Sequence, residues 1–349
     1  MPKLPRAWPT GKGKLYKRLG QIVAPRDKFR TIDLAYAKLC DGKARFMSVL
    51  ASSFIARSWF RSSCLLGAAL GLLSCGDSTS PDPLPTPLKV NFAAKLATTP
   101  FACGSIYPGI GTTGASVSIE DFRMYVSNFR TLDATGKEHP IALVSDKKWQ
   151  SATVALLDFE NATGPCGELG TTETNSEVNA TFDGSGIAAL KFSLGVPEAE
   201  AHQNVGLAAA PLSLGSMFWG WQAGYKFMRV DFSATGADPA MPASQWLIHV
   251  GSTGCQSAAS SVAPTTACAR PNRAEVTLVG WQPGKTVVVD FASLLANVDV
   301  LTNTPATAPG CMSDPEDPEC KLVLANLGLA VATGQCAGGC VSQKLFRLE

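Results

Sequence analysis

The chain has 349 residues, with eleven cysteines, only three histidines and a formal net charge of +2. This total hides an asymmetry, because residues 1–75 carry 14 Lys and Arg against 3 Asp and Glu, whereas the remaining 274 residues carry 16 against 25. A nucleic-acid-binding protein needs a basic surface, so the acidic main part of the chain argues against a nucleic-acid partner. The length permits two domains, although one β-rich domain of roughly 200–250 residues is equally compatible.

The basic N-terminal segment, residues 1–75, is predicted to be an extension followed by a lipoprotein signal peptide. Residues 64–73 form an apolar run of signal-peptide length that is too short to cross a bilayer. The run ends in Leu-Leu-Ser-Cys, which resembles a bacterial lipobox and implies lipid attachment at Cys75. An ordinary signal peptide or a buried apolar helix is the alternative. The glycine after Cys75 favours a periplasm-facing position on the outer membrane.

Residues 76–87 are polar and rich in proline, which predicts an extended tether. Residues 88–349 contain many short apolar runs separated by Gly, Pro, Asn and Asp. This pattern predicts a single, mostly β domain, either an antiparallel β-sandwich or a partly open barrel with few short helices. We expect a hairpin that joins residues 122–126 to 141–144 around a turn at 133–136, and helices only at 291–298 and 203–208.

Eight cysteines follow Cys75, and an even number in an exported chain predicts up to four disulfides that staple the domain. The sequence leaves their connectivity open. Proximity along the chain favours the pairs Cys103–Cys166, Cys255–Cys268, Cys311–Cys320 and Cys336–Cys340. A thiolate metal site at Cys336 and Cys340 is the less favoured reading, because no histidine lies nearby. A Cys-x-x-Cys-His motif is absent, so a covalently attached haem is not expected.

The most unusual stretch is MFWGWQAGYKF at residues 217–227, which places two tryptophans around a glycine. Two of the three histidines, His202 and His249, flank it. Neutral imidazole is the commonest protein ligand for transition metals, so this arrangement indicates a small metal or redox site. If the stretch is extended, Met217, Trp219 and Trp221 share one face.

Several further blocks occur in a characteristic order: FACG at 101–104, DFRMYVSN at 121–128, LLDFE at 156–160 and GSTGC at 251–255. Together with the Trp-Gly-Trp motif they resemble the MbnP family of bacterial copper-binding proteins, from about residue 89 to the C-terminus. The resemblance implies that the first tryptophan of the motif, Trp219, is oxidised to kynurenine by a dihaem partner (MbnH) of the MauG and cytochrome c peroxidase superfamily. It also implies that copper binding, expected as Cu(I), depends on this change.

Tryptophan offers one N–H donor and no lone pair for a metal, whereas kynurenine has an aniline nitrogen and a ketone oxygen. Related copper proteins use two histidines and one kynurenine, which implies His202, His249 and modified Trp219 as ligands here. Met217 and Trp221 are candidate neighbours, although Met217 is more simply interpreted as a core residue and Trp221 either relays electrons or only packs. A hydrogen-bonded core histidine is the competing interpretation for both ligands. Trp246 is expected in the core and His139 at the surface.

We therefore expect a non-enzymatic, lipid-anchored protein that binds one copper ion in copper homeostasis. The alternative is a surface lipoprotein that recognises a protein or glycan through Trp219 and Trp221 as an aromatic patch, and a third reading is electron transfer by a cycling copper. A nucleophile elbow is absent. The acidic residues 314–319 are predicted to form a solvated disulfide loop rather than a calcium site.

Overall fold

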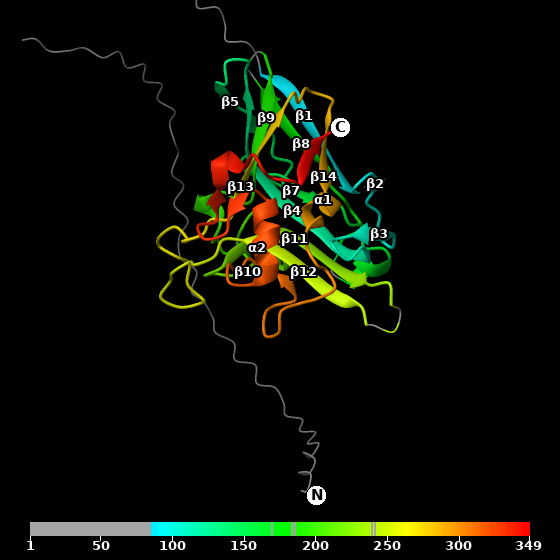
Figure 1. Cartoon of the computed structure of the whole chain (residues 1–349). Coiled ribbons are helices and arrows are strands. Elements are labelled where there is room, and N and C mark those ends of the chain that lie inside the picture. Colours follow the sequence, from blue (N-terminus) through cyan, green and yellow to red (C-terminus); the bar gives the residue numbers. More distant parts are fainter. Residues whose placement is uncertain (1–84, 169, 183, 185, 239, 241) are drawn as a thin grey trace, which may run out of the picture. The chain divides into compact units, whose positions relative to one another are not determined.

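The computed structural model describes residues 85–349 except 169, 183, 185, 239 and 241 (Figure 1). The predicted signal peptide, Cys75 and residues 76–84 of the predicted tether lie outside the described residues. The first strand begins at Thr86, so Thr86 and Pro87 pair with a neighbouring strand instead of belonging to the tether. Within the described part of the chain, no helix is long and apolar enough to cross a membrane.

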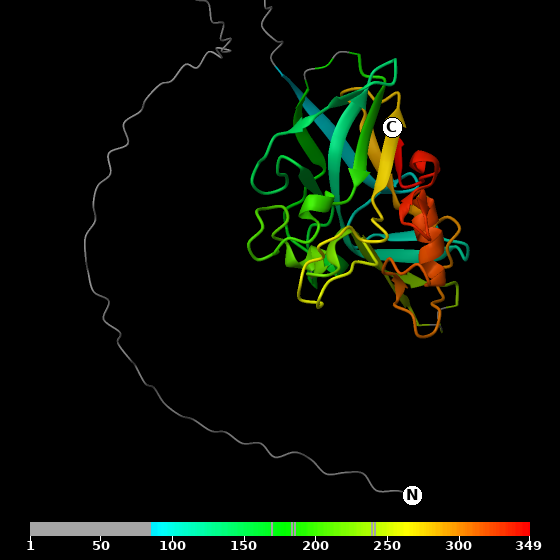
Figure 2. The ribbon, with the colours of Figure 1, turned by 90° about the vertical axis from the view of Figure 1, so that its left-hand side faces the viewer.

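Two curled sheets make up most of the domain (Figures 1 and 2). The smaller sheet has the order β18–β14–β1–β8–β6, with β2 paired to β1. Its strands are β1 (Thr86–Leu96), β2 (Thr99–Pro100), β6 (Ala142–Leu143), β8 (Glu177–Phe182), β14 (Thr286–Asp290) and β18 (Phe346–Leu348).

The larger sheet has the order β13–β9–β4–β11–β12–β15, with β3, β5 and β7 paired to β4 and β10 paired to β11. Its strands are β3 (Ile106–Ile110), β4 (Ala115–Leu132), β5 (Glu138–Pro140), β7 (Val154–Asp158), β9 (Ala189–Leu194), β10 (Phe218–Gly220), β11 (Gly224–Thr235), β12 (Ser244–Gly251), β13 (Ala274–Val279) and β15 (Gly310–Cys311). A two-stranded ribbon joins β16 (Leu329–Ala330) and β17 (Gln335–Cys336). The helices are α1 (Phe291–Leu295) and α2 (Pro318–Asn326), with short 3₁₀ turns at Gly164–Glu168, Glu198–Glu200, Gly215–Met217 and Ala337–Cys340.

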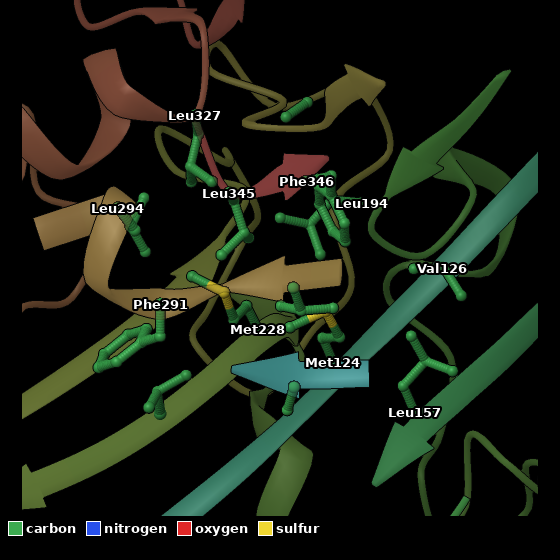
Figure 3. Close-up of a cluster of buried hydrophobic side chains, with 14 of the residues drawn as sticks. Met124, Val126, Leu157, Leu194, Met228, Phe291, Leu294, Leu327, Leu345 and Phe346 are labelled. Atoms are coloured by element: carbon green, nitrogen blue, oxygen red, sulfur yellow. The ribbon is translucent and has the colours of Figure 1, made fainter. Parts of the chain in front are cut away.

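The two sheets enclose one apolar core and form a half-barrel, which confirms the mostly β prediction. The ring of Phe92 on β1 meets the ring of Phe192 on β9 edge to face, with centroids 5.7 Å apart. Met124 and Met228, which are register partners on β4 and β11, lie beside each other in this core (Figure 3). The pairing is mostly antiparallel as expected, but β1 with β14 and β12 with β15 are parallel pairs.

The outer face of β4 and β11 is also covered, and this second layer positions the candidate site. Side chains alternate between the faces of a strand, so Met228 and Val230 enter the main core while Tyr225 and Phe227 face outwards. Residues from the segment 196–218 cover the outward-facing side chains in a second apolar cluster. Residues 224–232 are consequently all buried, and the charged side chains among them are largely removed from water.

The disulfide-stapled character of the fold is confirmed, and the four pairs are those that proximity favoured. Cys103–Cys166 ties the chain after β2 to the 3₁₀ turn Gly164–Glu168, and Cys311–Cys320 ties β15 to α2. Cys255–Cys268 closes the loop that follows β12. This loop, drawn in yellow, lies beside the 196–224 segment, and the backbone N–H of Gln222 donates to the carbonyl of Ser260 at 3.3 Å (Figure 2).

The hairpin turn predicted at 133–136 is present, but the two strands predicted to pair across it, 122–126 and 141–144, do not pair with each other. The N–H of Asp133 donates to the Lys137 carbonyl, and β4 returns as β5. Residues 122–126, however, pair with β7 and β11, whereas β6 joins the other sheet. The cause is the length of β4, whose 18 residues reach well past the segment that its apolar pattern marked.

Two helix predictions need correction. Residues 203–208 form turns, in which the N–H of Ala208 donates to the Asn204 carbonyl, and the helix expected at 291–298 ends at Leu295. The acidic loop at 314–319 begins helix α2, which the sequence reading missed. Its signals are an N-cap at Asp317, whose carboxylate accepts from the Glu319 N–H, and Pro318 in the first turn.

Candidate metal centre

A line of buried charges crosses the outer face of three neighbouring strands. Asp121 and Arg123 lie on β4, Arg229 and Asp231 on β11, and His249 on β12. The spacing of two residues puts each pair on one face of its strand. Arg229 is the register partner of both Arg123 and His249, so the pairing of the strands brings the groups together.

The charges alternate in sign and contact one another directly. Arg123 Nε donates to Asp121 at 2.8 Å, and Arg229 Nε lies 3.2 Å from Asp121 and 2.9 Å from Asp231. His249 Nε2 completes the line at 2.7 Å from Asp231 Oδ1. A buried charge is tolerated only when it is paired and hydrogen-bonded, so this network holds each of its members in a fixed position.

The network sets the protonation of His249. Burial raises the pKa of Asp231, but the hydrogen bonds from His249 and Arg229 outweigh this effect and hold that pKa below its usual value. Burial also lowers the pKa of His249, against the opposing effect of Asp231, and nearby Lys226 and Arg229 lower it further. A carboxylate can only accept, so the neutral imidazole donates its Nε2–H to Asp231 and keeps a lone pair on Nδ1. That Nδ1 is buried and has no hydrogen-bond partner among the described residues.

Trp219 lies beside this histidine. The ring centroids of Trp219 and His249 are 6.5 Å apart, with an angle of 52° between the planes. The indole packs on Gly251, where a Cβ would come within 3.0 Å of Trp219 Cη2 and within 2.7 Å of the Tyr225 carbonyl. Glycine at this position therefore lets the indole approach strand β12.

Trp219 is half-buried and faces a cavity of about 440 Å³. Residues 252–255 and Met312 also line this cavity. The remaining lining residues are Gln222 and Ala223. The indole is thus open to a reagent or an ion on one side and contacts strand β12 on the other.

The same charged residues anchor the backbone that leads to Trp219. The carbonyl of Ser216 accepts from Lys226 Nζ at 2.9 Å and from Arg229 Nη1 at 3.2 Å, and the Ser216 hydroxyl accepts from Arg123 Nη1 at 3.2 Å. Burial lowers the pKa of Lys226 to about 8. The buried cations therefore fix both the Asp231–His249 pair and the segment that carries the tryptophan.

His202 occupies a neighbouring position with different contacts. Its Nδ1 lies 3.1 Å from the carbonyl of Trp221, which can only accept, so in the neutral ring Nδ1 carries the proton and Nε2 the lone pair. Nε2 lies 3.4 Å from Cys268 Sγ. The ring packs over Gly224, whose φ of +77° and close approach to His202 both require glycine. His202 faces a second cavity, of about 370 Å³.

The sequence profile of the MbnP family matches residues 85–313. The chain belongs to the MbnP family. Among solved structures, MbnP from Methylosinus trichosporium is similar, with 29% identity and a TM-score of 0.65 over 76% of this chain and 98% of that one. No curated protein matches the chain. Family membership supports a copper-related role of the MbnP type.

The remaining predicted site residues of this MbnP-family protein have simpler positions. Met217 is fully buried in the second apolar cluster, which agrees with a core role. The common face of Met217, Trp219 and Trp221 was expected only if the stretch is extended, and this condition is not met. Met217 ends a 3₁₀ turn, β10 covers only Phe218–Gly220, and Trp221 lies in the following turn. Trp246 is fully buried in the main core, as expected.

His139 was expected at the surface but is partly buried. Its Nε2 lies 2.9 Å from Asp133 Oδ2, and the imidazole meets the ring of Phe182 edge to face. These contacts brace the turn between β4 and β5, far along β4 from the charge network.

The charge network of this MbnP-family domain was missed at the level of sequence. The signal was present, because Arg229 and Asp231 interrupt an apolar strand at a spacing of two residues, and Asp121 and Arg123 do the same. Such spacing is typical of a strand with one face packed on the core and the other exposed to solvent. The covering segment 196–218, which removes that face from water, could not be inferred from local pattern.

Proposed function

We propose that this MbnP-family protein binds one copper ion, as Cu(I), through His249, His202 and a kynurenine formed at Trp219. In this proposal the protein serves copper homeostasis and is the substrate of a modifying enzyme rather than an enzyme itself. The observation that carries the proposal is the buried Nδ1 of His249, which has no hydrogen-bond partner in the described part of the chain and lies next to Trp219.

The donor chemistry fits copper. Imidazole nitrogen suits both copper oxidation states, and a burial-lowered pKa keeps His249 neutral near pH 7. Asp231 accepts a hydrogen bond from Nε2–H, the other ring nitrogen, and so is the kind of outer partner that histidine ligands of metals commonly have. His202 would contribute Nε2, since its Nδ1 is engaged by the Trp221 carbonyl. Met312, on the wall of the Trp219 cavity, adds a soft thioether nearby.

The modification supplies the ligand that tryptophan lacks. Two oxygen atoms add across the C2–C3 bond of the Trp219 indole, which breaks, and hydrolysis then releases C2 as formate. The product keeps an aniline nitrogen and a ketone oxygen. Two equivalents of peroxide, each reduced to water, supply the oxygen, and a dihaem protein of the MauG and cytochrome c peroxidase type is the proposed catalyst. The half-buried position of Trp219 on a cavity wall supports access by an external oxidant.

The proposed location is the periplasmic side of the outer membrane, with a lipid anchor at Cys75. The supporting features are the apolar run of residues 64–73, the lipobox-like end and the glycine at position 76. Eight further cysteines joined in four pairs agree with an oxidising compartment.

The test is peptide mass spectrometry of the protein co-expressed with its dihaem partner, followed by Cu(I) titration against a competing chelator. A gain of about 4 Da on the Trp219 peptide, together with one tightly bound copper, is the expected result. An unchanged Trp219 from a haem-loaded co-expression would reject the kynurenine mechanism. It would favour the alternative in which Trp219 and Trp221 form an aromatic contact patch, whose binding is indifferent to copper.

A further inference from the structure

The disulfide Cys255–Cys268 lies against a histidine. Cys268 Sγ is 3.4 Å from His202 Nε2, the ring nitrogen that holds a lone pair when Nδ1 donates to Trp221. Ligand atoms of His202, Cys255 and Cys268 all lie within 4.8 Å of one another. We propose that reduction of this disulfide creates a second metal site, in which the thiolates of Cys255 and Cys268 and the imidazole of His202 bind one thiophilic ion such as Cu(I).

The donor set has the chemistry of a soft-metal site. Two thiolates and one imidazole select Cu(I) or Zn²⁺ rather than hard cations such as Ca²⁺ or Mg²⁺. While the disulfide is intact, its two sulfurs are bonded to each other and the set offers only the imidazole. Reduction therefore raises the number of available metal donors from one, the imidazole, to three, the imidazole and two thiolates.

The chain around the sulfurs can yield as the site forms. Two thiolates bound at about 2.3 Å stand roughly 3.7 Å apart, so the sulfurs must separate on binding. The intervening residues 256–267 form a mostly exposed loop without helix or strand. His202 is held at Nδ1 by the Trp221 carbonyl and by the packing of its ring on Gly224, which leaves Nε2 directed at Cys268.

The site can be reached from both sides. Cys255 lines the cavity that Trp219 faces, and His202 lines the neighbouring cavity with residues 263–267 of the loop. What sets this disulfide apart is its histidine. Cys103 and Cys336 are more exposed than Cys255 and Cys268, but none of the other three pairs has a histidine in contact within the described residues.

The chemistry balances with a dithiol reductant. An external dithiol transfers two electrons and two protons to the Cys255–Cys268 bond and becomes a disulfide itself. Binding of one Cu(I) then displaces the two thiol protons, which go to solvent. An external disulfide then reoxidises the pair: it takes two electrons from the two thiolates and two protons from solvent and becomes two thiols, while the Cys255–Cys268 bond forms again and Cu(I) leaves. His202 returns to its contact with Cys268.

This inference shares His202 with the proposed function but needs no kynurenine. A background in which Trp219 is replaced by Phe therefore separates the two, because the kynurenine site cannot form in it. Each protein would be purified oxidised, treated with dithiothreitol, desalted without air and titrated with Cu(I) against a competing chelator. Alkylation and peptide mass spectrometry would report which cysteines are free.

In the Trp219→Phe background, reduction is expected to add one Cu(I) equivalent, and reoxidation to remove it. The double variant Cys255→Ser/Cys268→Ser should lose this equivalent, while Cys336→Ser/Cys340→Ser, the matched control, should keep it. His202→Gln should weaken binding by at least the roughly tenfold that loss of even an outer ligand partner causes. Equal copper uptake in both double variants, or no uptake when Cys255 and Cys268 are demonstrably free, would overturn the proposal.

Discussion

Asp231 accepts a hydrogen bond from His249 Nε2 at 2.7 Å, and this contact decides which nitrogen of the imidazole is free. Arg229 holds the same carboxylate from the other side at 2.9 Å, so the acceptor stays ionised and in place. The protein thereby fixes the tautomer of the neutral imidazole, with the hydrogen on Nε2 and the lone pair on Nδ1. In the proposed function, the lone pair of this ligand is therefore in place before copper binds.

Replacement of Asp231 by asparagine should weaken copper binding about 10-fold to 100-fold, because the outer partner of a histidine ligand loses its charge. The matched control is Asp121→Asn. Asp121 also pairs with Arg229 but does not contact His249, so its affinity should stay within about twofold. Chelator competition on the modified proteins measures both. An equal loss in the two variants would assign the effect to the charge network as a whole and contradict a specific role for Asp231.

Gly251→Ala should push the indole of Trp219 away from His249, because the new methyl group would meet Trp219 and the Tyr225 carbonyl. We expect a lower melting temperature and slower or incomplete modification of Trp219. Gly215→Ala is the control. Gly215 is exposed, it precedes Trp219 in the same segment of the chain, and a Cβ there would meet no atom within 4 Å. Thermal unfolding and peptide mass spectrometry give the two readouts. Full modification at the wild-type rate would show that close packing of Trp219 on β12 is not required.

Trp219→Phe should abolish tight copper binding and leave the fold intact, because phenylalanine cannot form kynurenine. Trp221→Phe should bind copper after modification, since the contact of this residue with His202 is through its backbone carbonyl. Copper titration and circular dichroism distinguish loss of the ligand from loss of the fold. Undiminished affinity in the Trp219 variant would contradict the kynurenine mechanism.

Local pattern predicted the fold class, because alternation within strands is a property of nearby residues. It also predicted the four cysteine pairs, because each joins cysteines that are consecutive along the chain, three of them 4 to 13 residues apart and Cys103–Cys166 63 apart. It did not predict the surroundings of the site. Burial of Arg229 and Asp231 depends on the segment 196–218, which crosses the outer face of the sheet. The sequences of β4 and β11 give no sign that this segment covers them. Likewise, His202 and Cys268 are 66 residues apart in the sequence. They meet because the Cys255–Cys268 loop folds against the turn at Gln222.

The pH dependence of stability should depend on Asp158. Burial raises the pKa of this carboxyl to about 8, with Glu160 and Asp121 adding to the effect and Arg123 opposing it, and its Oδ1 lacks a partner among the described residues. The folded state therefore keeps a proton that the unfolded state has released between about pH 4 and pH 8. The contribution of Asp158 to the free energy of unfolding is full below its unfolded pKa and falls as the pH rises towards 8.

Asp158→Asn should remove this contribution, so its free energy of unfolding should rise relative to the wild type between pH 5 and about pH 8.5. Urea unfolding at several pH values provides the measurement. Parallel curves for the wild type and Asp158→Asn would mean that Asp158 is ionised throughout.

Loss of the Cys103–Cys166 disulfide should destabilise the domain more than loss of Cys336–Cys340. The two bonds close loops of 63 and 4 residues, and the chain-entropy model gives roughly 4 and roughly 2 kcal/mol for these lengths. Each pair joins one buried and one half-buried cysteine, so Cys103→Ala/Cys166→Ala and Cys336→Ala/Cys340→Ala are matched in packing. Urea unfolding of the two variants tests the order. An equal loss of stability would show that contacts of the folded state, and not the entropy of the unfolded chain, set the contribution of these bonds.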